Sequence, residues 1–228
     1  MAMTLVCQNV SLYRRRADGA ERAILHGVNA TLNAGQGVMV SGETGAGKSS
    51  LLHIFAGLLR PSEGRIIVNG QTVSGWNTVH RDRWRRQVGI VFQHPHLLND
   101  LTVLENVILP MIPRGGSIAR LRKFAREAIE ACGIHHLAGQ KVAALSGGEQ
   151  QRVSIARAIV SKPAILIADE PTAHQDDEGT ELIINNLIRW KRPDSITIVA
   201  AHDPRWTRHE AFVDKHFLIE NGRLKEFR

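Results

Sequence analysis

Residues 42–49 combine glycines, a lysine and a serine at the spacing that binds phosphate groups. They read Gly-Glu-Thr-Gly-Ala-Gly-Lys-Ser and lie between an apolar run and a helical pattern. Glycines let backbone N–H groups curl around phosphate oxygens, and a helix that begins there adds its positive end. We expect Lys48 to reach the β- and γ-phosphates of a nucleotide and Ser49 to ligate Mg²⁺. The expected phosphate-binding residues are Gly42, Glu43, Thr44, Gly45, Ala46, Gly47, Lys48, Ser49 and Ser50. The structural alternative is a plain glycine turn before a helix.

Two carboxylates follow a second apolar run. Ile165–Ala168 has the composition of a buried strand, and Asp169 and Glu170 come directly after it. We expect Asp169 to hold Mg²⁺ through water and Glu170 to orient and deprotonate the water that attacks the γ-phosphate. The alternative is a strand that ends in solvent, followed by acids that cap a helix.

Short β-branched runs alternate with helical patterns along the chain, which predicts an α/β fold with a mainly parallel core sheet flanked by helices. Two Asn-Gly pairs predict hairpins, so an antiparallel part is expected as well. An alternating pattern over Met1–Tyr13 adds a strand at the start. The other candidate strands are Gly37–Ser41, Ile66–Val68, Val88–Phe92, Ala164–Asp169, Ser195–Ala201 and Phe217–Glu220.

Between Leu97 and Leu145 the strand signals are absent and apolar residues follow helical spacing. We expect an inserted helical subdomain there, with Ser117 at the start of its main helix and Gly133 at the end. The whole chain, 1–228, is interpreted as one domain. Residues 1–93 and 160–228 form its core, and 94–159 form the helical subdomain.

Composition excludes several classes of protein. Hydrophobic residues make up 43% and charged residues 22% of the 228 residues, as in ordinary globular domains. The longest apolar run, Ala164–Ala168, is too short for a membrane span, and no signal-peptide pattern is seen, so we expect a cytoplasmic protein. Cys7 and Cys132 lack metal-ligand spacing, which predicts buried thiols.

The formal net charge of +7 comes largely from basic clusters. Such charge suits nucleic acid, anionic lipid headgroups or ATP, and a merely solvated face is an equal alternative. The clusters are Arg14, Arg15 and Arg16; Arg81, Arg83, Arg85 and Arg86; and Arg120, Arg122, Lys123 and Arg126.

Leu145–Arg152 reads Leu-Ser-Gly-Gly-Glu-Gln-Gln-Arg. Ser146 and Glu149 predict a capping box at a helix start, and Gly147 and Gly148 permit close backbone approach to an anion. A well-capped helix explains the serine and the glutamate but not both glycines. With the phosphate loop and the two carboxylates in the same order, this run resembles the signature of the ATPase subunits of ABC transporters, and the resemblance spans nearly the whole chain.

The resemblance implies a P-loop NTPase of ABC type with ATP and Mg²⁺ as cofactors. In this family two copies enclose two ATP molecules, each between the phosphate loop of one copy and the signature, here Ser146–Glu149, of the other. A second ATPase subunit, expected to be another copy of this chain, is therefore a partner. Gln93 matches the family glutamine that touches Mg²⁺. His202 matches the histidine that contacts the γ-phosphate and steadies the catalytic glutamate.

Two places differ from the family pattern or leave it open. In the loop Pro171–Asp176, Gln175 stands where the family usually has leucine, while Asp176 keeps its place. That loop crosses the dimer interface in the family. Gln175 in place of leucine would therefore change the coupling between the two ATP sites. Tyr13 is the candidate for the aromatic that stacks on adenine, with Arg14 as the alternative, because a slip of one residue moves a strand residue to the other face.

The stretch Phe92–Val107 looks most like the lipoprotein-releasing, macrolide-export and cell-division branch. That branch implies integral membrane subunits that dock near Gln93–Leu101, and a peripheral position on the cytoplasmic face of the membrane. The exposed-leucine pair Leu97–Leu98 suits such docking or simple packing equally.

A regulatory ATPase that signals through a membrane partner without transport is the alternative. No second cassette or long coiled-coil insertion is present, so no nucleic acid partner is expected. A catalytically silent module is disfavoured by four intact residues: Lys48, Asp169, Glu170 and His202.

Overall fold

The computed structural model of the chain describes residues 3–15, 19–73, 75, 78–173, 175–203, 205–209 and 212–227. Four residues of the sequence interpretation lie outside this set. They are Met1 and Ala2 of the first expected strand, Arg16 of the first basic cluster, and His174 of the loop after Glu170.

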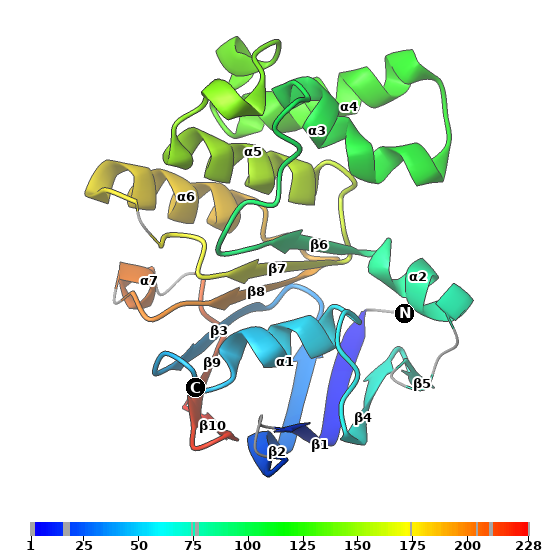
Figure 1. Ribbon diagram of the computed structural model, residues 1–228, viewed down its shortest axis with the longest axis vertical. Coiled ribbons are helices and arrows are strands. Elements are labelled where there is room, and N and C mark those ends of the chain that lie inside the picture. Colours follow the sequence, from blue (N-terminus) through cyan, green and yellow to red (C-terminus); the bar gives the residue numbers. More distant parts are fainter. Residues whose placement is uncertain are drawn as a thin grey trace.

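Two sheets form the body of the molecule (Figure 1). The smaller sheet is antiparallel, with the order β2-β1-β4-β5. Its strands are β1 (Thr4–Arg15), β2 (Glu21–Asn33), β4 (Glu63–Val68) and β5 (Gln71–Thr72). At the start of β1 the apolar alternation gives one buried face, where Leu5 and Cys7 are buried and the residues between and beside them are more exposed.

The larger sheet has the order β10-β9-β3-β8-β7-β6 and is parallel except for β10. Its central strands β7 and β8 are buried along their whole length because other elements cover both faces of the sheet. The α/β class with an antiparallel part is thereby confirmed. The strands are β3 (Gly37–Gly42), β6 (Val88–Val91), β7 (Ile165–Asp169), β8 (Ile196–Ala200), β9 (Lys215–Glu220) and β10 (Arg223–Glu226).

Both Asn-Gly pairs form tight hairpins. Asn69 and Gly70 have φ values of 49° and 79°, and Asn221 and Gly222 have values of 51° and 73°. Positive φ at both central residues is the requirement of a type I′ turn, which asparagine and glycine meet at low cost. These turns connect β4 to β5 and β9 to β10.

Helix α1 (Lys48–Phe55) lies between the two sheets (Figure 1). Its buried side chains Leu51, Leu52 and Phe55 share one apolar cluster with the antiparallel sheet and with one face of the larger sheet. The opposite face of the larger sheet packs against α5 (Gly147–Ile159) and α6 (Asp177–Arg189). The residue that begins α1, Lys48, is therefore fixed at the junction of both sheets.

The segment between β6 and β7 is helical, as its apolar spacing predicts, and forms the upper part of Figure 1. The Ser117 side chain accepts a hydrogen bond from the Arg120 N–H and caps α4, and Gly133 follows the helix with a φ of 69°. The helices here are α3 (Val103–Ile108) and α4 (Ile118–Ala131), with short 3-10 turns at Leu109–Arg114, His135–Leu137 and Val142–Ala144. Elsewhere lie α2 (Thr78–Arg85) and α7 (Arg205–Arg208). Within the described ranges, no helix combines the length and the hydrophobicity of a membrane span.

Burial makes both cysteines unreactive. Cys7 and Cys132 are each 1% exposed, and burial raises the pKa of each thiol to about 12. Because the thiolate is the reactive form, we expect neither to be alkylated by iodoacetamide in the native protein at neutral pH, and both to react after denaturation. Mass spectrometry of the labelled chain measures this directly. Rapid labelling of either thiol in the folded state would contradict the burial.

Candidate functional site

Three neighbouring parallel strands bring the expected site residues to one edge of the larger sheet. Strand β8 lies between β3 and β7, and its Ala200 pairs with Val40 on one side and with Asp169 on the other. Since the carboxyl ends of these strands are level, the loops that follow them meet. Lys48 comes after β3, Glu170 after β7 and His202 after β8.

The phosphate loop fits tightly against the strands beside it. A Cβ added at Gly42 would lie 2.5 Å from the Ile219 carbonyl oxygen, and one at Gly47 would lie 3.0 Å from the Ile24 carbonyl oxygen. Both glycines also have positive φ, which a larger residue would adopt only with strain. The loop thus curls tightly, and its lysine is aimed inward. Lys48 Nζ donates to the carbonyl oxygens of Gly42 at 2.8 Å and Glu43 at 3.3 Å.

Glu170 lies between a lysine and a histidine. Its Oε1 is 3.2 Å from Lys48 Nζ, and its Oε2 is 2.9 Å from His202 Nδ1. The side chains of Lys48 and Glu170 are 6% and 10% exposed, so their ion pair is shielded from water. Glu170 has a φ of 45°, an uncommon value for a residue other than glycine, and its N–H donates to the Ala200 carbonyl at 2.8 Å. Such a backbone costs about 1–3 kcal/mol and is typical of functional positions.

Asp169 presents a donor set that suits a magnesium ion. Its carboxylate hydrogen-bonds to Ser49, and burial raises its pKa. Its buried Oδ1 has no hydrogen-bond partner among the residues that the structure describes. An unsatisfied carboxylate oxygen beside a hydroxyl fits Mg²⁺, which proteins commonly bind through one or two side chains together with substrate phosphates. No group of three His, Cys, Asp or Glu residues suited to a metal occurs in the described part of the chain.

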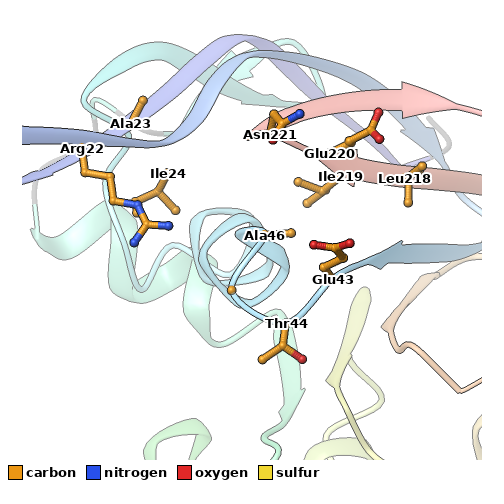
Figure 2. Close-up of a pocket in the computed structure, with 12 residues that line it drawn as sticks. Arg22, Ala23, Ile24, Glu43, Thr44, Ala46, Leu218, Ile219, Glu220 and Asn221 are labelled. Atoms are coloured by element: carbon orange, nitrogen blue, oxygen red, sulfur yellow. The ribbon is translucent and has the colours of Figure 1, made fainter.

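A cavity of about 270 Å³ joins these groups. Gln93, which follows β6, contributes to its wall and so lies with Lys48, Ser49, Glu170 and His202. The other lining residues are Arg14, Ile24, Thr44, Gly45, Gly47 and Ser50. A larger cavity of about 740 Å³ lies on the other side of the phosphate loop. Figure 2 shows Arg22 and Ile24 of β2 at one end of this second cavity, loop residues Thr44 and Ala46 below it, and Asn221 above it.

The Tyr13 side chain lies beside β4 and does not line the phosphate cavity. The Tyr13 hydroxyl donates to Glu63 at 3.3 Å, and its N–H donates to Ser62 Oγ at 3.0 Å, both beside β4. Adjacent side chains on a strand point to opposite faces, and it is Arg14 that lines the cavity with Ile24. A register shift lies between Leu12 and Tyr13, at the point where a slip of one residue would exchange the faces of Tyr13 and Arg14.

The signature begins a helix, as its capping-box pattern predicts. Ser146 N–H donates to Glu149 Oε2 at 2.8 Å, and Glu149 N–H donates to Ser146 Oγ at 3.3 Å. The serine hydroxyl also lowers the pKa of Glu149. Ser146, Gly148 and Glu149 line a cavity of about 390 Å³, separate from the one around Lys48. Within one chain, the signature and the phosphate loop therefore line different cavities.

The loop after Glu170 packs onto the signature through Gln175. A Cβ at Gly148 would lie 2.9 Å from Gln175 Oε1, so only glycine fits there without movement. Asp176 caps α6, because its Oδ1 accepts the Gly179 N–H at 2.7 Å. Gln175 differs from the leucine that is usual in the family pattern. In the structure its side chain lies against Gly148 in the signature of its own chain.

Gln151 has a role in the structure that the sequence interpretation missed. It is 3% exposed, and its Nε2 donates to the carbonyl oxygens of Phe92 at 3.3 Å and Pro171 at 3.1 Å. One amide group thus ties the segment that contains Gln93 to the loop that follows Glu170. The local sequence pattern does not predict that this polar residue is buried. Its position close to the signature, two residues after Glu149, is the signal that could have suggested a structural role.

Comparison with known proteins agrees with this geometry. The family model described as "ABC transporter" matches residues 25–173. The lipoprotein-releasing system ATP-binding protein LolD of Xanthomonas axonopodis pv. citri is 33% identical over 226 residues, which is 98% of this chain and 91% of that protein. The cell division ATP-binding protein FtsE of Escherichia coli is 40% identical over 182 residues, or 80% of this chain and 82% of that protein.

Solved structures match over nearly the full length. The dimeric cassette MJ0796, in a post-hydrolysis state bound to ADP and Pi, superposes with a TM-score of 0.90 at 31% identity, covering 98% of this chain and 99% of that one. CbiO1 from Clostridium perfringens, part of the transporter complex cbiONQ, gives a TM-score of 0.83 at 30% identity, covering 97% of this chain and 86% of that one.

The opposite faces of Tyr13 and Arg14 lead to a prediction about nucleotide affinity. A guanidinium stacks favourably on the face of an aromatic ring such as a purine. We expect Arg14→Ala to weaken ATP binding by about 1 kcal/mol, or roughly fivefold. The neighbouring control, Tyr13→Phe, removes only the Glu63 contact and should leave ATP affinity unchanged. Isothermal titration calorimetry measures both, and the reverse ranking would contradict the placement of Arg14.

Proposed function

This chain belongs to the ABC transporter family and is an ATP-binding cassette subunit, and on that premise we propose how its residues use ATP. The observation that carries the proposal is the position of Glu170, held between Lys48 and His202 at the edge of the parallel sheet. A γ-phosphate in contact with Lys48 lies within reach of Glu170. A water between them has an acceptor for its proton, as hydrolysis requires.

Each of the other expected residues has a defined task in this proposal. The phosphate loop from Gly42 to Ser50 wraps the phosphates with backbone N–H groups. Ser49 and Asp169, joined by Gln93, would hold Mg²⁺, which neutralises charge on phosphate oxygens. His202 keeps the Glu170 carboxylate turned toward the attacking water through its hydrogen bond.

A second copy of the chain completes the site in this proposal. Ser146–Glu149 begins α5, whose first N–H groups are available to an anion, but these residues line a cavity of their own. The MJ0796 cassettes are described as dimeric. In the proposed homodimer, the signature of each copy contacts the ATP bound to the other copy. Both cavities, the one beside the signature and the one around Lys48, then take part in nucleotide binding. Asp176 and Gln175 then lie at the interface, beside the signature.

The proposed partners of the dimer are integral membrane subunits. Two relatives are named for lipoprotein release and cell division. The docking surface we propose is Gln93–Leu101, where Leu98 is 52% exposed while Leu97 packs on the core of the helical part. Apart from Gln93, that surface belongs to the proposed helical subdomain, 94–159, which would move against a core of 1–93 and 160–228. The protein would then be peripheral on the cytoplasmic face of the membrane, and nucleic acid has no part in the proposal.

ATP would act as a clamp in such a complex. Bound between two copies it holds them together, and hydrolysis through Glu170 removes that link. The proposed linkage from the ATP site to the docking surface is Gln151, which contacts Phe92, directly before that surface, and Pro171, directly after Glu170. The alternative is a regulatory ATPase that signals through its membrane partner without transport. The relative named for cell division favours it, and the site residues are the same.

The role of Glu170 is tested by Glu170→Gln. The amide keeps the size of the side chain but cannot accept the proton, so we expect phosphate release to fall about a hundredfold or more while ATP still binds. The dimer should become longer-lived in ATP, which light scattering detects. Glu127→Gln on the exposed face of α4 is the control for loss of one carboxylate. Hydrolysis at the normal rate in Glu170→Gln would exclude this residue as the base.

Membrane coupling is tested by purifying the tagged chain from membranes in mild detergent. We expect an integral membrane protein to accompany it and to change its ATPase rate. Leu98→Asp should reduce the recovery of that protein, because it places a charge on the apolar docking surface. Ile118→Asp, at another exposed apolar residue, is the matched control. Recovery of the cassette alone, with a rate insensitive to membranes, would contradict the coupling.

A further inference from the structure

Arg205 joins two segments that both border the hydrolytic residue. Its Nε donates to Asp203 Oδ2 at 3.0 Å, its Nη2 lies 2.8 Å from the same oxygen, and its Nη1 donates to Asp177 Oδ1 at 2.5 Å. Asp203 directly follows His202, whereas Asp177 is the first residue of α6. One guanidinium therefore connects the segment after β8 with the helix that follows the loop after Glu170.

The short helix α7 lies beside the beginning of α6 (Figure 1). A second contact is found one turn further along α6, where His209 Nε2 is 3.4 Å from Glu181 Oε2. Asp177 and Glu181 are four residues apart, so they lie on one face of α6. A helix of four residues has little stability of its own. Trp206, which is fully buried and packs with its ring centroid 5.7 Å from that of Phe212, anchors it to the body of the molecule.

The two carboxylates that contact Arg205 have different roles. The contact with Asp203 is local, because Asp203 Oδ1 also accepts the Arg205 N–H at 2.9 Å and so supports the first turn of α7. Burial disfavours the charged form of Asp203, but hydrogen bonds from Arg205 outweigh this effect and lower its pKa. Asp203 therefore orients the guanidinium as a charged partner. A helix-stabilising ion pair explains this contact but not the one with Asp177, which lies 28 residues earlier in the chain.

A cavity of about 410 Å³ is lined by both segments that Arg205 joins. Since side chains do not fill this space, polar contacts set the spacing of its walls. One such contact is the hydrogen bond between Glu170 and His202 at 2.9 Å, and another is the pair of Arg205 with Asp177. The lining residues are Glu170, Thr172, Ala173, Gln175, His202, Asp203 and Arg205.

We propose that Arg205 is a positioning residue that couples the dimer interface to hydrolysis. In the proposed homodimer Gln175 and Asp176 lie at the interface, and Asp177 comes directly after them. A second copy that displaces this loop also displaces Asp177, and Arg205 transmits the shift to the segment that carries His202.

The hydrogen bond from His202 then sets the direction of the Glu170 carboxylate. Binding of the second copy thus acts on the base through the chain's own ion pairs. This inference rests on the proposed function and adds a residue outside the family motifs to it.

The test compares ATP hydrolysis by Arg205→Gln and Asp177→Asn in the full chain. We expect kcat to fall about fivefold and about threefold, effects of the size expected for exposed charge pairs. The KM for ATP and the ATP-dependent dimer should be unchanged, because the pair acts on the chemical step rather than on binding.

Arg192→Gln is the matched control. Arg192 pairs with Asp194, also two residues away, at 2.8 Å, but it lies at the opposite end of β8 from the site. Its loss removes the same charge and the same kind of local ion pair, so kcat should stay at the wild-type value.

A double-mutant cycle isolates the coupling. Arg205→Gln/Asp177→Asn should hydrolyse ATP at the rate of Arg205→Gln alone, because Asp177 acts only through Arg205. Arg205→Lys keeps the charge but not the fork that contacts two carboxylates, so its kcat should lie between those of the wild type and Arg205→Gln. Asp177 is fully exposed, so Asp177→Asn tests the pair without disturbing the core. An unchanged kcat in Asp177→Asn, additive losses in the double variant, or an equal loss in Arg192→Gln would each overturn the proposal.

Glu170→Gln separates this inference from the function on which it rests. If that variant stops hydrolysis and dimerises in ATP while Asp177→Asn hydrolyses ATP normally, the proposed function stands and the role of Arg205 fails alone. If ATP produces no dimer, the proposed function fails and this inference fails with it.

Discussion

The site depends on the cost of burying a carboxylate. Glu170 is almost enclosed, and an isolated charge in that position would be strongly destabilising. Lys48 supplies the compensating charge, and His202 supplies a hydrogen bond on the other carboxylate oxygen. The pair forms only if β3, β7 and β8 end at the same level, so the register of the larger sheet, Val40 to Ala200 to Asp169, is a condition for the chemistry. A one-residue slip of β7 would turn these carboxylates toward opposite sides.

The surrounding architecture serves that register. Helix α1 is packed between two sheets, which fixes where Lys48 begins, and glycines at 42 and 47 let the loop come into contact with β9 and β2. The helical part is joined to this core through α5, which begins with the signature and packs on the larger sheet. The positions of the signature, the phosphate loop and the Glu170 carboxylate therefore follow from one packing arrangement.

Local patterns in the sequence were sufficient where the determining interactions are themselves local. The capping box at Ser146, the hairpins at Asn69 and Asn221, and the cap at Ser117 all appear as predicted, since each depends on residues a few positions apart. The α/β class followed from the alternation of strands and helices. The same rule explains why Asp169 and Glu170 could be placed at a strand end before any contact was known.

Contacts between segments that are distant in the chain could not be predicted from such local patterns. Arg14 lines the phosphate cavity and Tyr13 does not, and the register shift beside them in β1 is recorded by no motif. The burial of Gln151 depends on carbonyls 59 and 20 residues away in the chain. Arginines that are scattered in the sequence, from the end of α2, the turn after α3 and α5, line one groove in the structure: Arg85, Arg86, Arg114 and Arg157.

The amide of Gln151 also restricts how the molecule can move. Its two N–H groups are both used, one on each side, and the site is sealed from solvent. If the segment at Phe92 separated from the loop at Pro171, one buried carbonyl would lose its partner with no water to replace it. Displacement of either segment is therefore costly unless the other follows. The segment at Phe92 and the loop at Pro171 are therefore expected to move together.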